Sequence, residues 1–341
     1  MPIIRPSTYR SSPLMANGHL QTILPSLLRR VKSVRYRRER IATPDDDFID
    51  LDWSRHGSRH LALLCHGLEG SSRASYMRGM ARALNQAGWD AVAYNYRGCS
   101  GTINRRLRAY HSGATDDLAV VHRHIAATHT YHSIGFVGFS LGGNLVLKYL
   151  GENAASLDPE EHWAAAVSVP CDLKASARQL DRVVNQVYNW RFLRTLTAKA
   201  RWKAHRYPGC IDTSRLTSVR SLKDFDDVYT APVHGFQDAE DYWQRCSALG
   251  FLNNIRVPTL LVNALNDPFL APTCFPYAAA RRNDSLFLET PVSGGHVGFL
   301  PSNPRQPFWH EARVAQFAGA HHAGGAPAKI FRNSSDRPFN P

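Results

Sequence analysis

The sequence predicts an α/β protein in which a mostly parallel sheet is flanked by helices on both faces. Short apolar runs recur along the chain, and their lack of polar alternation is typical of strands buried on both faces. Helical patterns stand between these runs, as the crossover connections of parallel strands require. The chain has 341 residues, 43% hydrophobic and 20% charged, which is the composition of a globular protein and enough length for one large domain.

The predicted elements follow one another in a regular order. Residues 1–32 show no clear periodicity, and residues 33–54 are expected to form an antiparallel hairpin because apolar and polar residues alternate in its second half. Beyond the hairpin, buried strands are expected at 61–66, 89–95, 133–140, 162–170, 257–264 and 285–290, with helices at 73–87, 115–129, 141–151, 271–282 and 306–320.

One stretch interrupts this order. Residues 171–252 carry helical patterns and turns without a convincing buried strand. We expect this insertion to form a helical cap over the carboxyl edge of the sheet, where open α/β sheets bind ligands. Residues 1–320 are therefore predicted to be a single domain with a cap at about 171–252, and the Gly-, Pro-, Asn- and Ser-rich residues 321–341 are predicted to be a disordered tail.

The segment Gly138-Phe139-Ser140-Leu141-Gly142 is the sharpest chemical signal. It joins a predicted strand to a predicted helix, and its small flanking residues permit a tight turn that exposes the serine hydroxyl at a helix N-terminus. The same pattern also occurs in ordinary turns. Its position between a strand and a helix favours the interpretation of Ser140 as a nucleophile supported by Gly138 and Gly142.

A nucleophilic serine needs a basic histidine and an acid that orients the histidine. Asp267 and His296 follow Ser140 in the order serine, acid, histidine, and each comes directly after a predicted strand. Asp267 could instead form an Asx turn, and His296 could be an ordinary loop histidine among the sixteen in the chain. Because parallel strands end at one edge of the sheet, the three residues together predict a catalytic triad.

The oxyanion that forms when an ester is attacked needs two amide donors. One is the backbone NH of Leu141, which follows the serine. The other is expected from Leu68 in the segment His66-Gly67-Leu68-Glu69-Gly70, where glycines permit a sharp turn directly after a strand. His66 and Gly67 are supporting residues of this motif. Taken alone, the segment could equally be a glycine turn between a strand and a helix.

Several longer segments resemble one known family. With them the chain resembles the bacterial YheT-like branch of the α/β-hydrolase superfamily, which is related to eukaryotic α/β-hydrolase-domain lipid esterases and phospholipases. The resemblance implies an α/β-hydrolase fold, a serine carboxylesterase activity and a triad of Ser140, Asp267 and His296. The chain departs from the family at Asn266, where an acid often stands. The matching segments are NGHLQTILP (17–25), HGLEGSS (66–72), NYRGCSG (95–101), YHSGATDDL (110–118), GFSLGGN (138–144), FDDVYTAPVHGFQDAEDYW (225–243), LNDPF (265–269) and GGHVGF (294–299).

The expected reaction is hydrolysis of a carboxylic ester through an acyl-enzyme on Ser140, with no metal or organic cofactor. The expected substrate is a small-molecule ester, either short-chain or lipid. Aromatic residues of the insertion could hold its apolar part, or they could simply pack the insertion against the main domain. These residues are Tyr188, Trp190, Phe192, Phe225, Tyr229, Phe236 and Trp243.

Two other functions stay open at this point. The protein could be an acyltransferase that uses the same serine, or one that uses His111 and Asp116, whose spacing occurs in some lipid acyltransferases. These residues could instead belong to the start of a helix that Asp116 favours electrostatically. The protein could also be a catalytically silent binding protein with a basic surface. The histidines at 122, 124, 129 and 132 lack an acid or cysteine at ligand spacing, so a solvated face is favoured over a metal site.

The charge is uneven along the chain. The net charge is +13, of which residues 1–40 carry +8 and the other 301 residues +5. This distribution is compatible with weak peripheral contact of the N-terminal segment with an anionic membrane, and no nucleic-acid partner is expected. Six cysteines lie far apart and are expected to be reduced thiols, and no secretory signal or membrane-spanning stretch is recognised. The expected location is the cytoplasm, with peripheral membrane contact an open alternative.

Overall fold

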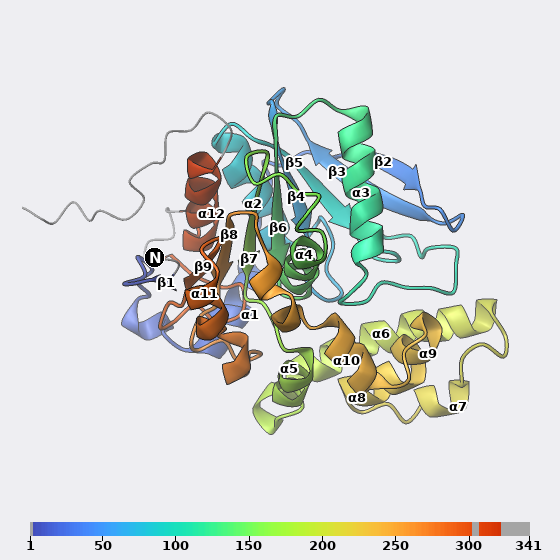
Figure 1. Cartoon of the computed structure of the whole chain (residues 1–341). Coiled ribbons are helices and arrows are strands. Elements are labelled where there is room, and N and C mark those ends of the chain that lie inside the picture. The colour runs from blue at the N-terminus through green and yellow to red at the C-terminus, as the bar shows by residue number, and fades with distance from the viewer. Residues whose placement is uncertain (1–2, 302–306, 322–341) are drawn as a thin grey trace, which may run out of the picture.

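The fold is a nine-stranded sheet flanked by helices, as a computed structural model shows (Figure 1). The structure describes residues 3–301 and 307–321, so all of the predicted tail at 321–341 except its first residue lies outside the described residues. The strands stand in the order β1-β9-β8-β7-β6-β4-β5-β3-β2. Their bounds are β1 Ile3–Ile4, β2 Arg37–Ala42, β3 Phe48–Ser54, β4 His60–Cys65, β5 Asp90–Asn95, β6 Ser133–Phe139, β7 His162–Val167, β8 Thr259–Val262 and β9 Leu286–Glu289.

The sheet is mostly parallel, as the sequence predicts. The first seven strands in the sheet order, β1-β9-β8-β7-β6-β4-β5, pair in parallel with their neighbours. Strand β3 is antiparallel to both β5 and β2. The predicted hairpin is confirmed, with Arg37 opposite Trp53 and Ala42 opposite Phe48. Every residue of β5, β6 and β7 is buried, which is the pattern of strands covered on both faces.

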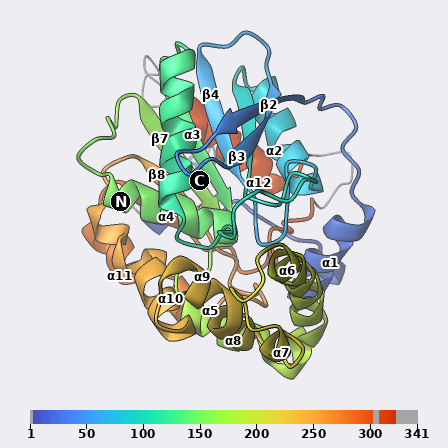
Figure 2. The same cartoon turned by 90° about the vertical axis from the view of Figure 1, so that its right-hand side faces the viewer.

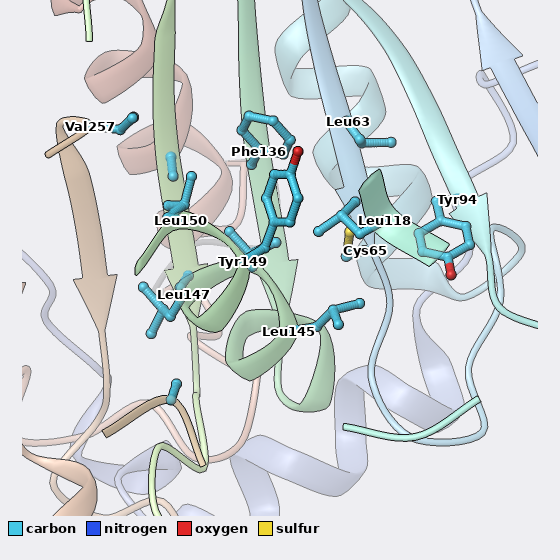
Figure 3. Close-up of a cluster of buried hydrophobic side chains, with 14 of the residues drawn as sticks. Leu63, Cys65, Tyr94, Leu118, Phe136, Leu145, Leu147, Tyr149, Leu150 and Val257 are labelled. Atoms are coloured by element: carbon cyan, nitrogen blue, oxygen red, sulfur yellow. The ribbon is translucent and has the colours of Figure 1, made fainter. Parts of the chain in front are cut away.

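Helices cover the two faces through separate hydrophobic clusters. On one face, α3 (Thr115–Thr128) and α4 (Leu141–Glu152) contribute leucines, valines and isoleucines to a cluster with β4 and β6, and Figure 3 shows Tyr149 of α4 beside Phe136. On the other face, α2 (Ser75–Gln86) and α12 (Trp309–Ala320) contribute Met77, Met80 and Phe317. This two-sided burial holds the strand ends in place.

The predicted helix at 271–282 is interrupted. Its first part is a 3-10 turn, Pro272–Cys274, and the α-helix α11 begins only at Tyr277 and ends at Arg282. Pro276 immediately precedes α11 and lacks the backbone NH that a continuous helix would need. The six cysteines have free thiols, and Cys210 alone among them is exposed.

A helical layer lies at the edge of the sheet where β6 and β8 end (Figures 1 and 2). It comprises residues 171–254 between β7 and β8, a fully described stretch in which no strand occurs. No helix of the described residues is both long and apolar enough to cross a membrane. The helices of the layer are α5 Leu173–Leu180, α6 Gln186–Arg206, α7 Thr213–Leu216, α8 Leu222–Phe225, a π-helical turn Asp226–Thr230, α9 Ala231–His234 and α10 Ala239–Cys246, and short 3-10 turns stand at Val183–Asn185, Ala248–Gly250 and Leu252–Asn254.

Residues 3–36 hold a strand and an α-helix that sequence periodicity missed, together with a 3-10 turn at Pro13–Met15. Strand β1 adds to the sheet beside β9, and helix α1 spans Gly18–Leu28. The Asn17 side chain caps α1 by accepting hydrogen bonds from the backbone NH groups of His19 and Leu20. Asn17 was the signal available in the sequence. The apolar pattern was obscured because α1 turns Leu27 and Leu28 to solvent and contains Pro25.

Candidate active site

The three residues predicted to form a triad meet at the carboxyl edge of the sheet. Ser140 follows β6, and Asp267 and His296 lie in the loops after β8 and β9. The Nε2 atom of His296 lies 2.9 Å from Ser140 Oγ, and its Nδ1 atom lies 2.9 Å from Asp267 Oδ2. The side chains therefore form a continuous hydrogen-bonded chain from the hydroxyl to the carboxylate.

Ser140 occupies a strained turn between β6 and α4. Its φ of 53° and ψ of −121° lie outside the conformations that most L-residues adopt. Only glycine fits at positions 138 and 142, because a side chain would clash with the backbone. A Cβ on Gly138 would lie 2.3 Å from the carbonyl oxygen of Gly142, and a Cβ on Gly142 would lie 2.4 Å from the carbonyl oxygen of Cys65. Ser140 is half-buried and is the N-cap residue of α4, so the turn places its hydroxyl at the N-terminus of that helix.

The Asp267 carboxylate is buried and fixed in orientation. Asp267 is 5% exposed, and its Oδ1 atom accepts a hydrogen bond of 2.9 Å from the backbone NH of Phe269. The Phe269 ring packs on the His296 ring with centroids 4.2 Å apart. A buried carboxylate on Nδ1 favours the tautomer in which Nε2 can accept the serine proton.

Helix α1 supports the histidine loop, which sequence reasoning did not anticipate. The hydroxyl of Thr22 accepts a 2.9 Å hydrogen bond from the backbone NH of His296. The histidine loop can approach α1 this closely because residue 298 is a glycine. A Cβ at that position would lie 2.1 Å from the carbonyl oxygen of Gln21. Ser168, which follows β7, accepts a 2.9 Å hydrogen bond from the NH of Val297.

Asn266, the residue that departs from the family pattern, has a structural role beside the acid. Its Oδ1 accepts a 3.0 Å hydrogen bond from the NH of Gly295, and its Nδ2 donates to the carbonyl oxygen of Ala16 at 2.7 Å. The amide thus links the acid loop to the histidine loop and to the N-terminal segment. A carboxylate could not make the second bond, because it has no donor.

The loop after β4 carries the residues predicted to support the oxyanion. Burial lowers the pKa of His66 to about 3, so its ring is neutral. Its Nδ1 donates to the Gly67 carbonyl oxygen at 2.8 Å, and its Nε2 accepts from the NH of Tyr96 at 3.2 Å. A Cβ on Gly67 would lie 3.2 Å from Ser140 Cβ, so the loop passes close to the nucleophile. Leu68 and Leu141 both line the cavity at Ser140.

Glu69, beside Leu68, links this loop to the helical layer. It has a positive φ of 55°, and its side chain is 6% exposed. The Tyr110 hydroxyl accepts a hydrogen bond from the Glu69 NH at 2.9 Å and donates one to Glu69 Oε1 at 2.7 Å. Lys199 of α6 donates to the same oxygen at 2.8 Å. Glu69, Tyr110 and Lys199 were not recognised in the sequence, because their contacts join distant segments.

A cavity between the sheet edge and the helical layer is lined by Ser140 and His296. Ser140, His296 and Phe269 line it from the sheet side, and Phe192 and Leu196 of α6 line it from the layer. Of the aromatic residues singled out in the insertion, four line the cavity, whereas Tyr188 stacks on His19, Trp190 is exposed and Phe236 packs on Tyr242. The four are Phe192, Phe225, Tyr229 and Trp243.

The acyltransferase motif is not assembled. His111 lines the cavity, and burial holds its pKa well below the usual range. Asp116 lies elsewhere, with a side chain 60% exposed and paired with Arg108 at 2.6 Å. The described contacts of Asp116 therefore do not orient His111.

The histidine cluster on and near α3 is dispersed over different partners. His122 contacts Tyr149 and His162, and His124 contacts Glu39 at 2.8 Å. Among the residues that the structure describes, no group of three or more His, Cys, Asp or Glu side chains is arranged to hold a metal ion.

Comparisons with known proteins define the family. The alpha/beta hydrolase fold family matches residues 63–302. A solved structure of the Pyrococcus furiosus esterase Pf2001 shares the fold, with a TM-score of 0.57 and 18% identity over 85% of this chain and 94% of that one. The fold and the match at residues 63–302 show a hydrolase fold of this class, and the chain belongs to the α/β-hydrolase family.

The relatives narrow the class further. The chain is 37% identical to "Putative esterase YheT" of Escherichia coli (strain K12) over 306 residues, which cover 88% of this chain and 89% of that protein. It is 29% identical to phospholipase ABHD3 of Mus musculus, over 88% of this chain and 75% of that protein. These similarities place the chain in the YheT-like branch, as the sequence motifs predict.

Proposed function

We propose that the protein is a serine carboxylesterase that hydrolyses its substrate through an acyl-enzyme on Ser140. The observation that carries the proposal is the hydrogen-bonded chain from Ser140 through His296 to the buried Asp267. A serine, a base and an orienting acid in this arrangement suffice to activate the hydroxyl. The names of the YheT and ABHD3 relatives, an esterase and a phospholipase, agree with ester chemistry.

Acylation uses the three side chains in turn. Ser140 Oγ attacks the ester carbonyl carbon while His296 Nε2 takes the hydroxyl proton, and Asp267 stabilises the imidazolium. The carbonyl oxygen becomes an oxyanion that accepts hydrogen bonds from the backbone NH groups of Leu68 and Leu141. When the tetrahedral intermediate collapses, the bond to the leaving oxygen breaks and His296 gives its proton to the departing alcohol.

Deacylation repeats these steps with water. His296 removes a proton from a water molecule, which attacks the acyl carbon, and the same amides hold the second oxyanion. The collapse returns the proton to Ser140 Oγ and releases the carboxylic acid. Side chains, amides and water supply every step, so the proposed route uses no cofactor.

The cavity supports an ester with an apolar acyl group. Leu68, Leu141 and Phe269 stand beside the nucleophile, and Phe192, Leu196 and Phe225 continue the apolar lining into the helical layer. We therefore assign the layer the role of a cap that holds the acyl chain. The expected substrates are esters of aliphatic acids, lipid esters included.

The test is hydrolysis of p-nitrophenyl esters by the purified protein and its Ser140→Ala variant. The account predicts turnover by the wild type and loss to background in the variant, with an unchanged melting temperature. Ser176→Ala is the matched control, because Ser176 also lines the cavity but contacts Cys274 and not His296. Equal turnover by the wild type and Ser140→Ala would refute the mechanism.

A further inference from the structure

The segment leading into α6 turns apolar side chains outward and amide side chains inward. Val183, Val187 and Trp190 are 87%, 73% and 61% exposed, whereas Asn185 and Asn189 are 0% and 1% exposed. A surface helix of a globular protein ordinarily shows the opposite arrangement. The outward valines and tryptophan therefore need an explanation other than packing within this chain.

The inward asparagine is held by the catalytic edge of the sheet. Asn185 Nδ2 donates to the carbonyl oxygens of Gln179 and Pro268, each at 2.8 Å. Pro268 directly follows the acid of the triad. The orientation of this segment is thus fixed by buried hydrogen bonds, and its apolar exposure is a stable property of the fold.

The same face of α6 is strongly basic. Residues 182–206 contain seven lysines and arginines and no aspartate or glutamate. Two of the seven, Lys199 and Lys203, turn inward, and the other five are exposed. Arg191, Arg194 and Arg201 are exposed, and the Arg194 guanidinium lies 4.9 Å from the centre of the Trp190 ring. Within the described part of the chain, none of these three arginines forms an ion pair with a carboxylate.

These side chains share one face of the helix. At about 100° per residue, positions 187, 190, 191, 194 and 201 of α6 fall within an arc of roughly 100°, and Val183 lies in the 3-10 turn that leads into the helix. We call this surface, formed by Val183, Val187, Trp190, Arg191, Arg194 and Arg201, the α6 outer face.

The N-terminal segment, with a similar excess of positive charge, differs in this respect. Arg29 pairs with the buried Glu311 at 2.6 Å, Arg38 with Asp52 at 2.8 Å, and Arg40 with Asp50 at 2.7 Å. Part of its charge is therefore neutralised within the molecule. Its exposed cations Arg30 and Lys32 follow Leu27 and Leu28, which are 67% and 71% exposed, so this segment also presents apolar side chains but no tryptophan.

The opposite face of α6 belongs to the candidate active site. Phe192 and Leu196 line the cavity, and Tyr188 and Phe192 both contact the Phe269 ring. Helix α1 lies beside the start of α6 (Figure 2), with the Tyr188 hydroxyl 3.1 Å from His19 Nδ1. A partner bound to the α6 outer face would thus be separated from the cavity by the thickness of one helix.

We propose that the α6 outer face docks the protein on an anionic phospholipid bilayer. The valines and Trp190 would enter the headgroup and acyl boundary, while the arginines contact anionic headgroups. A nucleic acid would satisfy the arginines but would leave the outward valines unexplained. The proposal extends the ester hydrolase function by placing the cavity at a surface rich in lipid esters, but vesicle binding itself does not require that function.

The experiment measures co-sedimentation of the full chain with vesicles of phosphatidylcholine containing 30% phosphatidylglycerol, and with vesicles of phosphatidylcholine alone. At about fivefold per arginine at an anionic surface, Arg191→Gln/Arg194→Gln/Arg201→Gln is expected to lower the affinity for the anionic vesicles by about 100-fold. Val187→Ser/Trp190→Ser is expected to weaken binding to both vesicles by about tenfold.

The matched control neutralises three exposed N-terminal cations, Arg30→Gln/Lys32→Gln/Arg35→Gln. It is expected to change the affinity less than threefold. The proposal is wrong if the wild type fails to bind the anionic vesicles, if the control loses more affinity than the α6 variant, or if the protein binds polyuridylate in preference to vesicles.

Folding and ester hydrolysis are monitored separately from docking. All variants are expected to retain the wild-type melting temperature, because the substituted side chains are exposed. Turnover of a soluble short-chain ester is expected to stay unchanged. A wild type that binds vesicles but hydrolyses no ester would overturn the proposed function and leave the docking surface standing, whereas active protein without vesicle binding would do the reverse.

Discussion

The carboxyl edge of the sheet and the helical layer above it are built in different ways. At the edge, backbone geometry fixes the reactive groups: Ser140 has a φ of 53°, and the NH of His296 is held by Thr22. In the layer, long side chains make the decisive contacts, such as Lys199 on Glu69. In the proposed mechanism the edge therefore supplies the reacting groups, whereas the layer lines the cavity and aligns the loop that carries Leu68.

The two regions meet through a few specific contacts. Lys199 reaches Glu69, which adjoins the proposed oxyanion donor Leu68, and Asn185 holds the carbonyl oxygen of Pro268. If the edge and the layer have these separate roles, substitutions at the edge should stop the reaction. Substitutions in the layer should have smaller effects on the reaction rate, on the stability of the protein or on its binding to membranes.

The largest effect is expected at the edge, from Asp267→Asn. The amide would present a donor to His296 and favour the wrong tautomer, so kcat/KM for a p-nitrophenyl ester should fall by about 10³- to 10⁴-fold. Steady-state kinetics provide the measurement. Asn266→Asp is the neighbouring control and should retain activity within about tenfold; a harmless Asp267→Asn would show that another group serves as the acid.

The next largest effect concerns a buried acid of the layer, Asp226. Burial raises its pKa to about 7, although Thr230 and Trp243 donate hydrogen bonds to its carboxylate. The raised pKa means that the folded state binds this proton more tightly than the unfolded state does. The stability that the neutral carboxyl contributes is present below about pH 4 and is lost as the pH rises through about 7.

Asp226→Asn should therefore gain in stability relative to the wild type as the pH rises. The relative gain between pH 5 and pH 8 is expected to be about 1 to 3 kcal/mol, because the amide cannot ionise. Thermal unfolding of both proteins across this range measures it. A melting-temperature difference that is independent of pH would contradict the account of Asp226.

A smaller effect is expected where the layer contacts the edge. Lys199→Met would remove one of the two groups that hold Glu69 Oε1, and the proposed oxyanion donor beside it would lose alignment. We expect kcat to fall by about tenfold with KM nearly unchanged, and Lys199→Arg to restore most of it.

The control for Lys199 is Lys174→Met, which removes the ion pair with Glu240 in the same layer. It should leave kcat unchanged. An equal loss in both variants, or a loss confined to KM, would assign Lys199 a general packing role and not a positioning role.

The smallest effect is expected from Asp116→Asn. Asp116 pairs with Arg108 at the surface and makes no described contact with His111. Neither hydrolysis nor the ratio of acyl transfer to hydrolysis, measured with added methanol, should change by more than twofold. A selective loss of transfer would revive the acyltransferase interpretation.

The meeting of the three predicted triad residues could be foreseen from the sequence because each signal is local. Ser140, Asp267 and His296 each follow a strand that can be recognised from its own apolar run, and parallel strands bring such ends together. Thr22, Lys199 and Glu69 were missed because their roles depend on contacts between segments that are far apart in the chain.

The distribution of charge was harder to predict for a related reason. Counting residues by segment identified the N-terminal excess, yet Arg38 and Arg40 turn out to be paired across the hairpin. The cations of α6 were averaged with acids elsewhere in residues 41–341. Only the folded arrangement shows which positive charges remain available to a partner.

The most direct test of the central claim is the site of covalent modification by a fluorophosphonate ester probe. The account predicts that the wild type gains the mass of one phosphonyl group, that peptide mapping places it on Ser140, and that Ser140→Ala gains none. Labelling of a different residue, or no labelling of a folded wild-type protein, would contradict the proposal that Ser140 is the nucleophile.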